Sequence, residues 1–279
     1  EPKKFFQEQK IVNFKKEWYF YDEILNLNKK PDLDYLKKIE EKYKINLWVI
    51  AYGERLFHKY NQYYKFSENE ILLLIEKEIR FYEKILDEIK PDFLFCKLTD
   101  FHNVELLYQI CKARKIKILM STASKLGNRI IYSQEADKIN PLKNPKKVEQ
   151  RDFIQLQNIL QEHNSTEILK AVIKYEKTSS LKNINSIKSI FKMFLSSGEN
   201  NDRTRFLDKG RTRKRMILNM SKFYFKKRKR TSFINSNFSN EIPKENFILF
   251  PLHDEPERTT LIAAPFFTDQ LSMIKKIAK

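Results

Sequence analysis

The fold is decided by residues 67–120, SENEILLLIEKEIRFYEKILDEIKPDFLFCKLTDFHNVELLYQICKARKIKILM. Ser67 and Glu70 form a capping-box pair, in which the hydroxyl and the carboxylate each satisfy a free backbone amide at the start of a helix. Apolar residues then recur at helical spacing as far as Ile89, and Pro91 ends the pattern. The first half of this stretch therefore predicts a long amphipathic helix that begins after Ser67.

The second half of the stretch alternates strand and helix patterns. Residues 93–96 and 116–120 are short apolar runs typical of buried strands, and residues 104–113 between them have helical spacing. Parallel neighbouring strands need a crossover connection of about this length. The pattern therefore predicts an α/β fold with a parallel sheet.

The same patterns continue toward both ends of the chain. Residues 32–44 and 266–278 have helical spacing, and residues 47–51 (LWVIA) and 247–250 (FILF) are short apolar runs that we expect to be strands. A chain with only four glycines is poorly suited to an architecture of many tight β-turns.

Shifts in composition divide the chain into three parts. We expect residues 1–200 to form an N-terminal sheet domain, residues 201–244 a basic helical segment and linker, and residues 245–279 the start of a second sheet domain. One strand and one helix cannot bury both faces of a sheet. We therefore expect the protein to continue beyond the last residue, and the first residue, Glu1, also suggests a partial chain.

Composition excludes several classes of protein. With 41% hydrophobic and 13% aromatic residues in 279, the chain can bury a core, which excludes global disorder. Two cysteines cannot make a disulfide scaffold and no Cys/His spacing of the zinc type is present, so we expect a reducing compartment. No apolar run approaches the ~20 residues of a membrane span.

The positive charge is concentrated in one segment. The formal net charge is +18, and eleven Lys and Arg residues with no acidic residue fall between Lys209 and Arg230. Such a run has three interpretations: a solvated face, a surface that binds anionic lipid, or a surface that binds nucleic acid. The lipid interpretation is suggested by the aromatic residues 223–225, which are interleaved with the cations. We regard nucleic acid as the least favoured of the three.

Polar residues follow each of three predicted strands. In open parallel sheets, ligands bind beyond the carboxyl ends of the strands. The candidate residues at these ends are Asp100 and His102; Ser121, Ser124, Lys125 and Arg129; and His253, Glu255, Glu257, Arg258, Thr259 and Thr260.

Most of these residues also have a purely structural interpretation. Asp100 or Asn103 could cap the helix that follows, and His102 could stack on Phe101 at the surface. The serines are also common turn formers. His253 is the strongest functional candidate, because histidine exchanges a proton near neutral pH and carboxylates follow it closely.

Standard catalytic and nucleotide-binding motifs are missing from the sequence. It contains no GxGxxG, Walker A, GxSxG or HExxH pattern. A Ser/His/Asp triad is not excluded by spacing, but nothing places a serine on a nucleophile elbow.

The C-terminal segment resembles one known family. Residues 250–253 (FPLH), Pro256-Glu257, Thr259-Thr260 and Phe267-x-x-Gln270, followed by Ile274 and Ile277-Ala278, are similar to the FPLHxxPE…T…F.DQ…I..IA segment of bacterial capsular and surface polysaccharide biosynthesis proteins. Residues 89–132 resemble the last crossover units of their N-terminal domain. The likeness covers about half of the chain and implies a glycosyltransferase of the GT-B type, which has two Rossmann-like domains with helices on both sheet faces.

The resemblance also implies roles for the candidate residues. It places a nucleotide-sugar donor and a glycan or lipid-linked acceptor in a cleft, with His253, Glu257 and Asp100 as catalytic candidates. The substrate-binding candidates are His102, Ser121, Ser124, Lys125, Arg129, Glu255, Arg258, Thr259, Thr260 and Gln270. Enzymes of this type need no metal, and we expect no cofactor.

Two alternatives to a glycosyltransferase remain at this point. A nucleotide-sugar epimerase has the same architecture, and the basic segment suits a non-enzymatic protein that binds polyanions. We expect a cytoplasmic location, with the basic segment at 209–230 meeting the inner face of the cell membrane.

Overall fold

The computed structural model describes slightly more than two thirds of the chain. The residues it describes are 2–24, 28–58, 63–124, 130–135, 138, 152–162, 188, 191, 210, 212–239, 241, 244–253, 261–262 and 264–278. The predicted domain boundary between residues 200 and 201 lies outside these ranges, and the division into 1–200, 201–244 and 245–279 stays a prediction.

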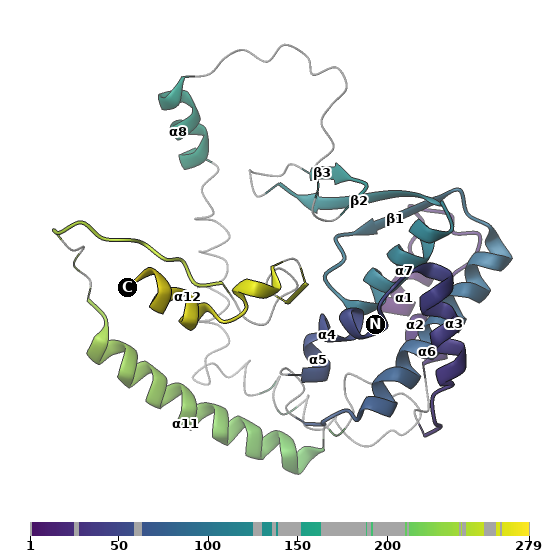
Figure 1. Cartoon of the computed structure of the whole chain (residues 1–279), viewed down its shortest axis with the longest axis horizontal. Helices are drawn as coiled ribbons and strands as arrows, with labels where there is room; N and C mark the ends of the chain where they lie inside the picture. Colours follow the sequence, from purple (N-terminus) through teal and green to yellow (C-terminus); the bar gives the residue numbers. More distant parts are fainter. Residues whose placement is uncertain are drawn as a thin grey trace.

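Helices and short strands make a mixed α/β unit in the first half of the chain (Figure 1). The elements of this unit are α1 (Pro2–Glu8), α2 (Phe20–Glu23), α3 (Leu33–Tyr43), α4 (Leu47–Tyr52), α5 (Arg55–His58), α6 (Glu68–Ile89), β1 (Phe93–Lys97), α7 (His102–Ala113), β2 (Lys117–Ala123) and β3 (Ile130–Ser133). Four further elements follow: α8 (Phe153–Glu162), α11 (Arg213–Asn237), the 3-10 helix η3 (Pro265–Phe267) and α12 (Gln270–Ile277).

Helix α6 confirms the long helix predicted from the capping box. The Ser67 side chain accepts a hydrogen bond from the Glu70 amide, and the Glu70 carboxylate accepts one from the Ser67 amide at 2.9 Å. The helix ends at Ile89, where Lys90 takes a left-handed conformation just before Pro91. Both ends of the helix therefore lie where the local sequence places them.

The sheet contains one parallel pair, as predicted, and one strand that the sequence did not reveal. Strands β1 and β2 are parallel, with Phe93 opposite Lys117 and Lys97 opposite Ser121. Strand β3 returns antiparallel to β2. The described residues thus form a three-stranded mixed sheet in the order β1-β2-β3, and not a full Rossmann-like domain.

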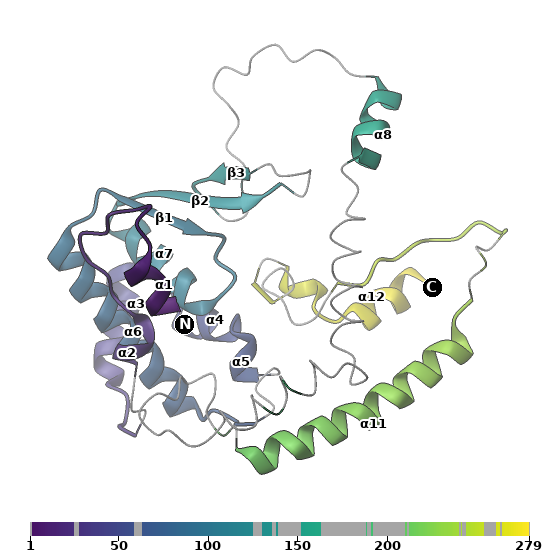
Figure 2. The ribbon, with the colours of Figure 1, turned by 180° about the vertical axis from the view of Figure 1, so that it is seen from behind.

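The helices of this unit cover one face of the sheet (Figure 2). On that face Met120 is fully buried, and Ile118 is nearly so. On the opposite face Phe95 and Tyr132 are 65% and 53% exposed. The expected helices on both faces are therefore not seen within the described residues.

The core lies between the sheet and helices α3, α6 and α7. Its most deeply buried side chains include Leu74, Ile75 and Ile79 from α6 and Leu106 and Ile110 from α7, all with no solvent exposure. Burying side chains of this size stabilises the fold by roughly 1.5–3 kcal/mol each. This packing holds α6 and α7 against one face of the sheet.

Two predicted strands are wrong. Residues 47–51 form helix α4, because the Asn46 side chain accepts a hydrogen bond from the Val49 amide at 3.0 Å and caps the helix. Burial of Leu47, Ile50 and Ala51 follows helical spacing. Residues 247–250 form no strand with any described part of the chain, and Leu249 is 80% exposed.

More of the predicted helices than of the predicted strands are confirmed. Helices α3, α7 and α12 match the expected ranges to within a few residues, and α11 lies within the predicted basic helical segment. Within the ranges given above, no helix combines the length and the apolar character needed to cross a membrane.

The cap of α6 yields a stability test. We expect Ser67→Ala to lower the free energy of unfolding by about 1 kcal/mol, because an amide of the first helical turn loses its acceptor. Ser67→Thr keeps the hydroxyl acceptor and is the matched control, so its loss should be clearly smaller. Urea unfolding followed by circular dichroism measures both. Equal losses in the two variants would contradict a capping role.

Candidate functional site

The carboxyl ends of β1 and β2 lie at one edge of the sheet. Because the two strands are parallel and Lys97 is opposite Ser121, the loops that follow them leave on the same side. The structure thereby brings Asp100, Ser121 and Ser124 to this edge, and β3 starts there at Ile130, opposite Ala123. Of the other candidates assigned to this edge, Lys125 and Arg129 lie outside the described residues.

The loop after β1 is short and tightly held. The Asp100 amide donates a hydrogen bond to the Leu98 carbonyl at 2.9 Å, and the Asp100 side chain faces solvent. Thr99 is 1% exposed, and its hydroxyl oxygen has no hydrogen-bond partner among the described residues. Helix α7 begins after Phe101 without a side-chain cap, so neither Asp100 nor Asn103 acts as the N-cap residue.

His102, the first residue of α7, points into the protein and not toward the edge. Its ring lies 5.1 Å from the ring of Phe57, and only 3% of the residue is exposed. Nδ1 is 2.5 Å from Glu54 Oε2, and Nε2 is 2.8 Å from Glu78 Oε1. The expected stacking on Phe101 at the surface is therefore replaced by a buried contact with two carboxylates.

The buried triad of Glu54, His102 and Glu78 has strongly perturbed protonation. Burial alone would lower the pKa of His102, but the charge of Glu78 and the hydrogen bond with Glu54 outweigh it and raise this pKa to about 10. Burial also raises the pKa of Glu78, whereas the hydrogen bond with His102 outweighs burial at Glu54 and lowers its pKa. The raised pKa favours the imidazolium form of His102, in which each ring nitrogen can donate to a carboxylate.

The triad joins three helical elements around the loop that carries Asp100. Glu54 directly precedes α5, Glu78 lies on α6 and His102 begins α7. Neither glutamate is among the residues predicted from the sequence. Glu78 had a detectable signal, because it falls four residues after Leu74 and four before Tyr82, within the apolar stripe of α6.

The C-terminal candidates are organised around Gln270, at the start of α12. Its side-chain oxygen accepts a hydrogen bond from the His253 amide at 2.7 Å, and its side-chain nitrogen donates to the His253 carbonyl at 3.0 Å. The His253 side chain is exposed. The two halves of the C-terminal motif, 17 residues apart, are therefore joined through one amide.

An open cavity of about 660 Å³ lies beside this amide contact. Its lining residues are Leu252, His253, Pro265, Phe266, Thr268, Asp269, Gln270 and Leu271. Asp269 caps α12 by accepting from the Ser272 amide at 3.0 Å. The candidates Glu255, Glu257, Arg258, Thr259 and Thr260 lie outside the described residues.

The C-terminal segment contacts the α/β unit close to the triad. Ile262 packs directly against Gly53, where a β-carbon would come within 2.4 Å of its terminal methyl group. Gly53 precedes Glu54, and the Arg55 guanidinium lies 5.9 Å from the centre of the Phe101 ring. The junction of α4 and α5 thus connects the loop after β1 with the C-terminal segment.

The described residues hold no group of three or more His, Cys, Asp or Glu side chains with the arrangement of a metal site. Comparisons with protein-family models, with curated proteins and with solved structures found no match to this chain.

The buried triad yields a pH-dependence test. Since the pKa of His102 is about 10 in the folded chain, above the ordinary 6.5, its protonation contributes stability that is fully present below pH 6.5 and is lost as the pH rises through 10. Glu78→Gln removes a negative charge beside His102 and so lowers the pKa of His102. The pH at which the free energy of unfolding falls should therefore decrease by roughly 1–3 pH units. Urea unfolding across this pH range measures the shift.

Glu41→Gln is the matched control for that test. Glu41 is an exposed carboxylate on α3, so its loss should leave the pH profile of unfolding unchanged. The same profile in the wild-type protein and in Glu78→Gln would show that Glu78 does not hold the charge of His102.

Proposed function

We propose that this chain is part of a glycosyltransferase that moves a sugar from a nucleotide-activated donor to a glycan or lipid-linked acceptor during the synthesis of a surface polysaccharide. One observation carries the proposal. The Gln270 side chain hydrogen-bonds to both the amide and the carbonyl of His253. This contact joins the FPLH part of the C-terminal motif to the F-x-x-Q part. The finer assignment, a GT-B architecture with two Rossmann-like domains, is part of this proposal.

The contact explains how His253 could act in the transfer. With its amide and carbonyl both held by Gln270, the His253 backbone is fixed while its side chain stays exposed beside the cavity. An exposed imidazole can take the proton of an acceptor hydroxyl as the glycosidic bond forms. Gln270 is then a positioning residue, and His253 is the catalytic candidate in the described part of the motif.

The edge of the sheet offers the acceptor side. Asp100, Ser121 and Ser124 supply a carboxylate and two hydroxyls where the parallel strands end, which suits hydrogen bonding to a sugar. Contact between Ile262 and Gly53 supports an arrangement in which the C-terminal segment faces this edge. Glu257 remains a catalytic candidate, Arg258 and Thr259 remain substrate-binding candidates that would approach the donor, and Asp100 is the alternative base.

The proposal is tested by assaying sugar transfer in the full-length gene product. UDP-, GDP- and CMP-linked sugars are supplied with a lipid-linked or polysaccharide acceptor, and glycosylated acceptor is measured. His253→Ala should lower kcat by about 10²–10⁴, the usual effect of losing a general base. Gln157→Ala on the exposed surface of α8 is the control and should leave the rate unchanged.

Two results would contradict the proposal. If the nucleotide sugar is isomerised without any acceptor, the protein is an epimerase. If transfer proceeds equally well in His253→Ala, the site lies elsewhere.

A further inference from the structure

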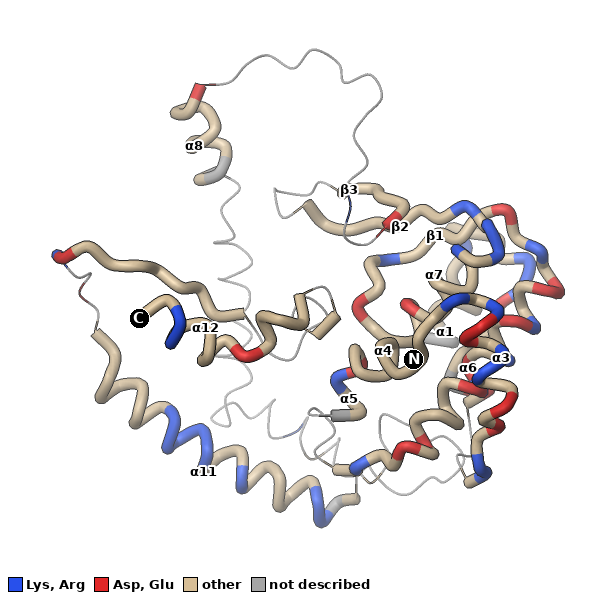
Figure 3. Tube along the Cα trace, viewed as in Figure 1, with Lys and Arg blue, Asp and Glu red and all other residues tan. Residues whose placement is uncertain are grey.

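Helix α11 has a charge distribution unlike any other described helix. It runs for 25 residues and carries nine Lys and Arg residues and no acidic one. The cations recur along most of its length (Figure 3). An isolated helix with no acidic side chain repels itself, so this charge favours an anionic partner.

The same helix exposes large apolar side chains among the cations. Phe223, Tyr224 and Phe225 are 59%, 55% and 65% exposed, and Phe233 and Ile234 are also more than half exposed. Burying this apolar surface would be favourable, and no other part of the described chain covers it. The partner of α11 must therefore be apolar as well as anionic.

Helical spacing separates these two kinds of side chain only in part over the middle of α11. Met220, Phe223 and Tyr224 fall on one side, and Lys222, Lys226 and Lys229 fall on the opposite side. Phe225 falls among the cations, whereas Lys227 falls within the apolar side and Arg228 and Arg230 flank it. The aliphatic stems of these three cations can lie along an apolar surface while the charged groups reach headgroup phosphates.

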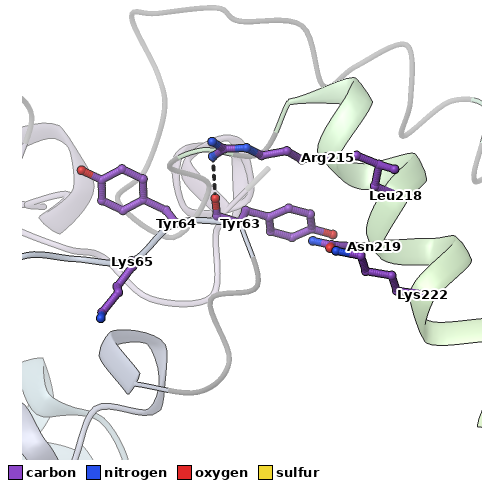
Figure 4. A pocket seen from close by; sticks show the side chains of 7 residues that line it. All are labelled: Tyr63, Tyr64, Lys65, Arg215, Leu218, Asn219 and Lys222. Carbon is purple, nitrogen blue, oxygen red and sulfur yellow. Dashed lines mark hydrogen bonds between the residues drawn. The ribbon is translucent and has the colours of Figure 1, made fainter. Parts of the chain in front are cut away.

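The N-terminal end of α11 is anchored to the α/β unit, as Figure 4 shows. The Arg215 guanidinium donates to the Tyr63 carbonyl at 2.7 Å, and Met216 is 2% exposed. Gly210 has a φ of +75°, and a β-carbon there would lie 2.6 Å from the same carbonyl. The helix is thus held at its first turn and projects its middle and C-terminal turns outward.

An open pocket of about 490 Å³ lies at this anchor. It is lined by Tyr63, Tyr64, Lys65, Arg215, Leu218, Asn219 and Lys222 (Figure 4). Three of these residues are cations, and the Tyr64 hydroxyl donates to the Glu70 carboxylate at 2.6 Å.

We propose that α11 docks this protein on an anionic lipid bilayer, with Met220, Phe223 and Tyr224 entering the interfacial region and the flanking cations contacting lipid phosphates. A bilayer accounts for both properties of the helix, because its headgroup region is negatively charged and its acyl boundary is apolar. Nucleic acid accounts for the cations but leaves Met220, Ile217 and Ile234 exposed.

The test is co-flotation of the whole chain with lipid vesicles. One set of vesicles contains phosphatidylglycerol mixed with phosphatidylcholine, and the other contains phosphatidylcholine alone. We expect binding to the anionic vesicles only. A variant that removes four cations should bind about 1,000-fold more weakly, since each lysine or arginine near such a surface adds a comparable increment. Its substitutions are Lys226→Gln, Lys227→Gln, Lys229→Gln and Arg230→Gln.

A matched control removes the same charge from another surface. Its substitutions are Lys15→Gln, Lys37→Gln, Lys38→Gln and Lys84→Gln, all at exposed positions. We expect this control to bind the anionic vesicles like the wild-type chain. A third variant, Phe223→Ser with Tyr224→Ser and Phe225→Ser, keeps every charge and should also bind more weakly.

Three results would overturn the proposal. The first is no flotation with the anionic vesicles, and the second is equal loss of binding in the two charge variants. The third is unchanged binding in the aromatic variant together with tight, salt-sensitive binding of a short RNA or DNA duplex, which would assign α11 to nucleic acid. Circular dichroism on each variant establishes that the helices are retained.

Discussion

The contact of His102 with Glu54 and Glu78 is the constraint on which the rest of the α/β unit depends. Three ionisable side chains are buried together, and removing one partner from such a group typically costs about 3–5 kcal/mol because a charge is left unpaired. The contact joins the start of α5, the middle of α6 and the first residue of α7. It therefore fixes where α7 begins, and so the course of the short loop that carries Asp100 at the edge of the sheet.

Local signals in the sequence predicted the helices and the parallel pair of strands. Ser67 and Glu70 marked the start of α6 correctly because a capping box involves only neighbouring residues. Leu47–Ala51 was mistaken for a strand because short apolar runs suit both structures, and only Asn46 distinguished them. The triad could not be predicted, since its members lie 24 and 48 residues apart and meet only through packing.

The proposed catalytic site and the proposed membrane surface require different structural properties. Gln270 fixes the backbone of His253 and leaves the imidazole free beside an open cavity, as a catalytic side chain requires. Helix α11 is anchored near its N-terminal end and leaves its aromatic side chains exposed, as a docking surface requires. A lipid-linked acceptor would link the two, because the enzyme must then reach its substrate at a bilayer.

The protonation state of His102 tests this account most directly. The ¹⁵N chemical shifts of its ring can be measured in the folded protein at about pH 8, where an ordinary histidine is neutral. The account predicts that both ring nitrogens carry a proton, because Glu54 and Glu78 each accept a hydrogen bond from the charged ring. A neutral ring at this pH, with one unprotonated nitrogen, would contradict it, and the buried charge could then not be what fixes the start of α7.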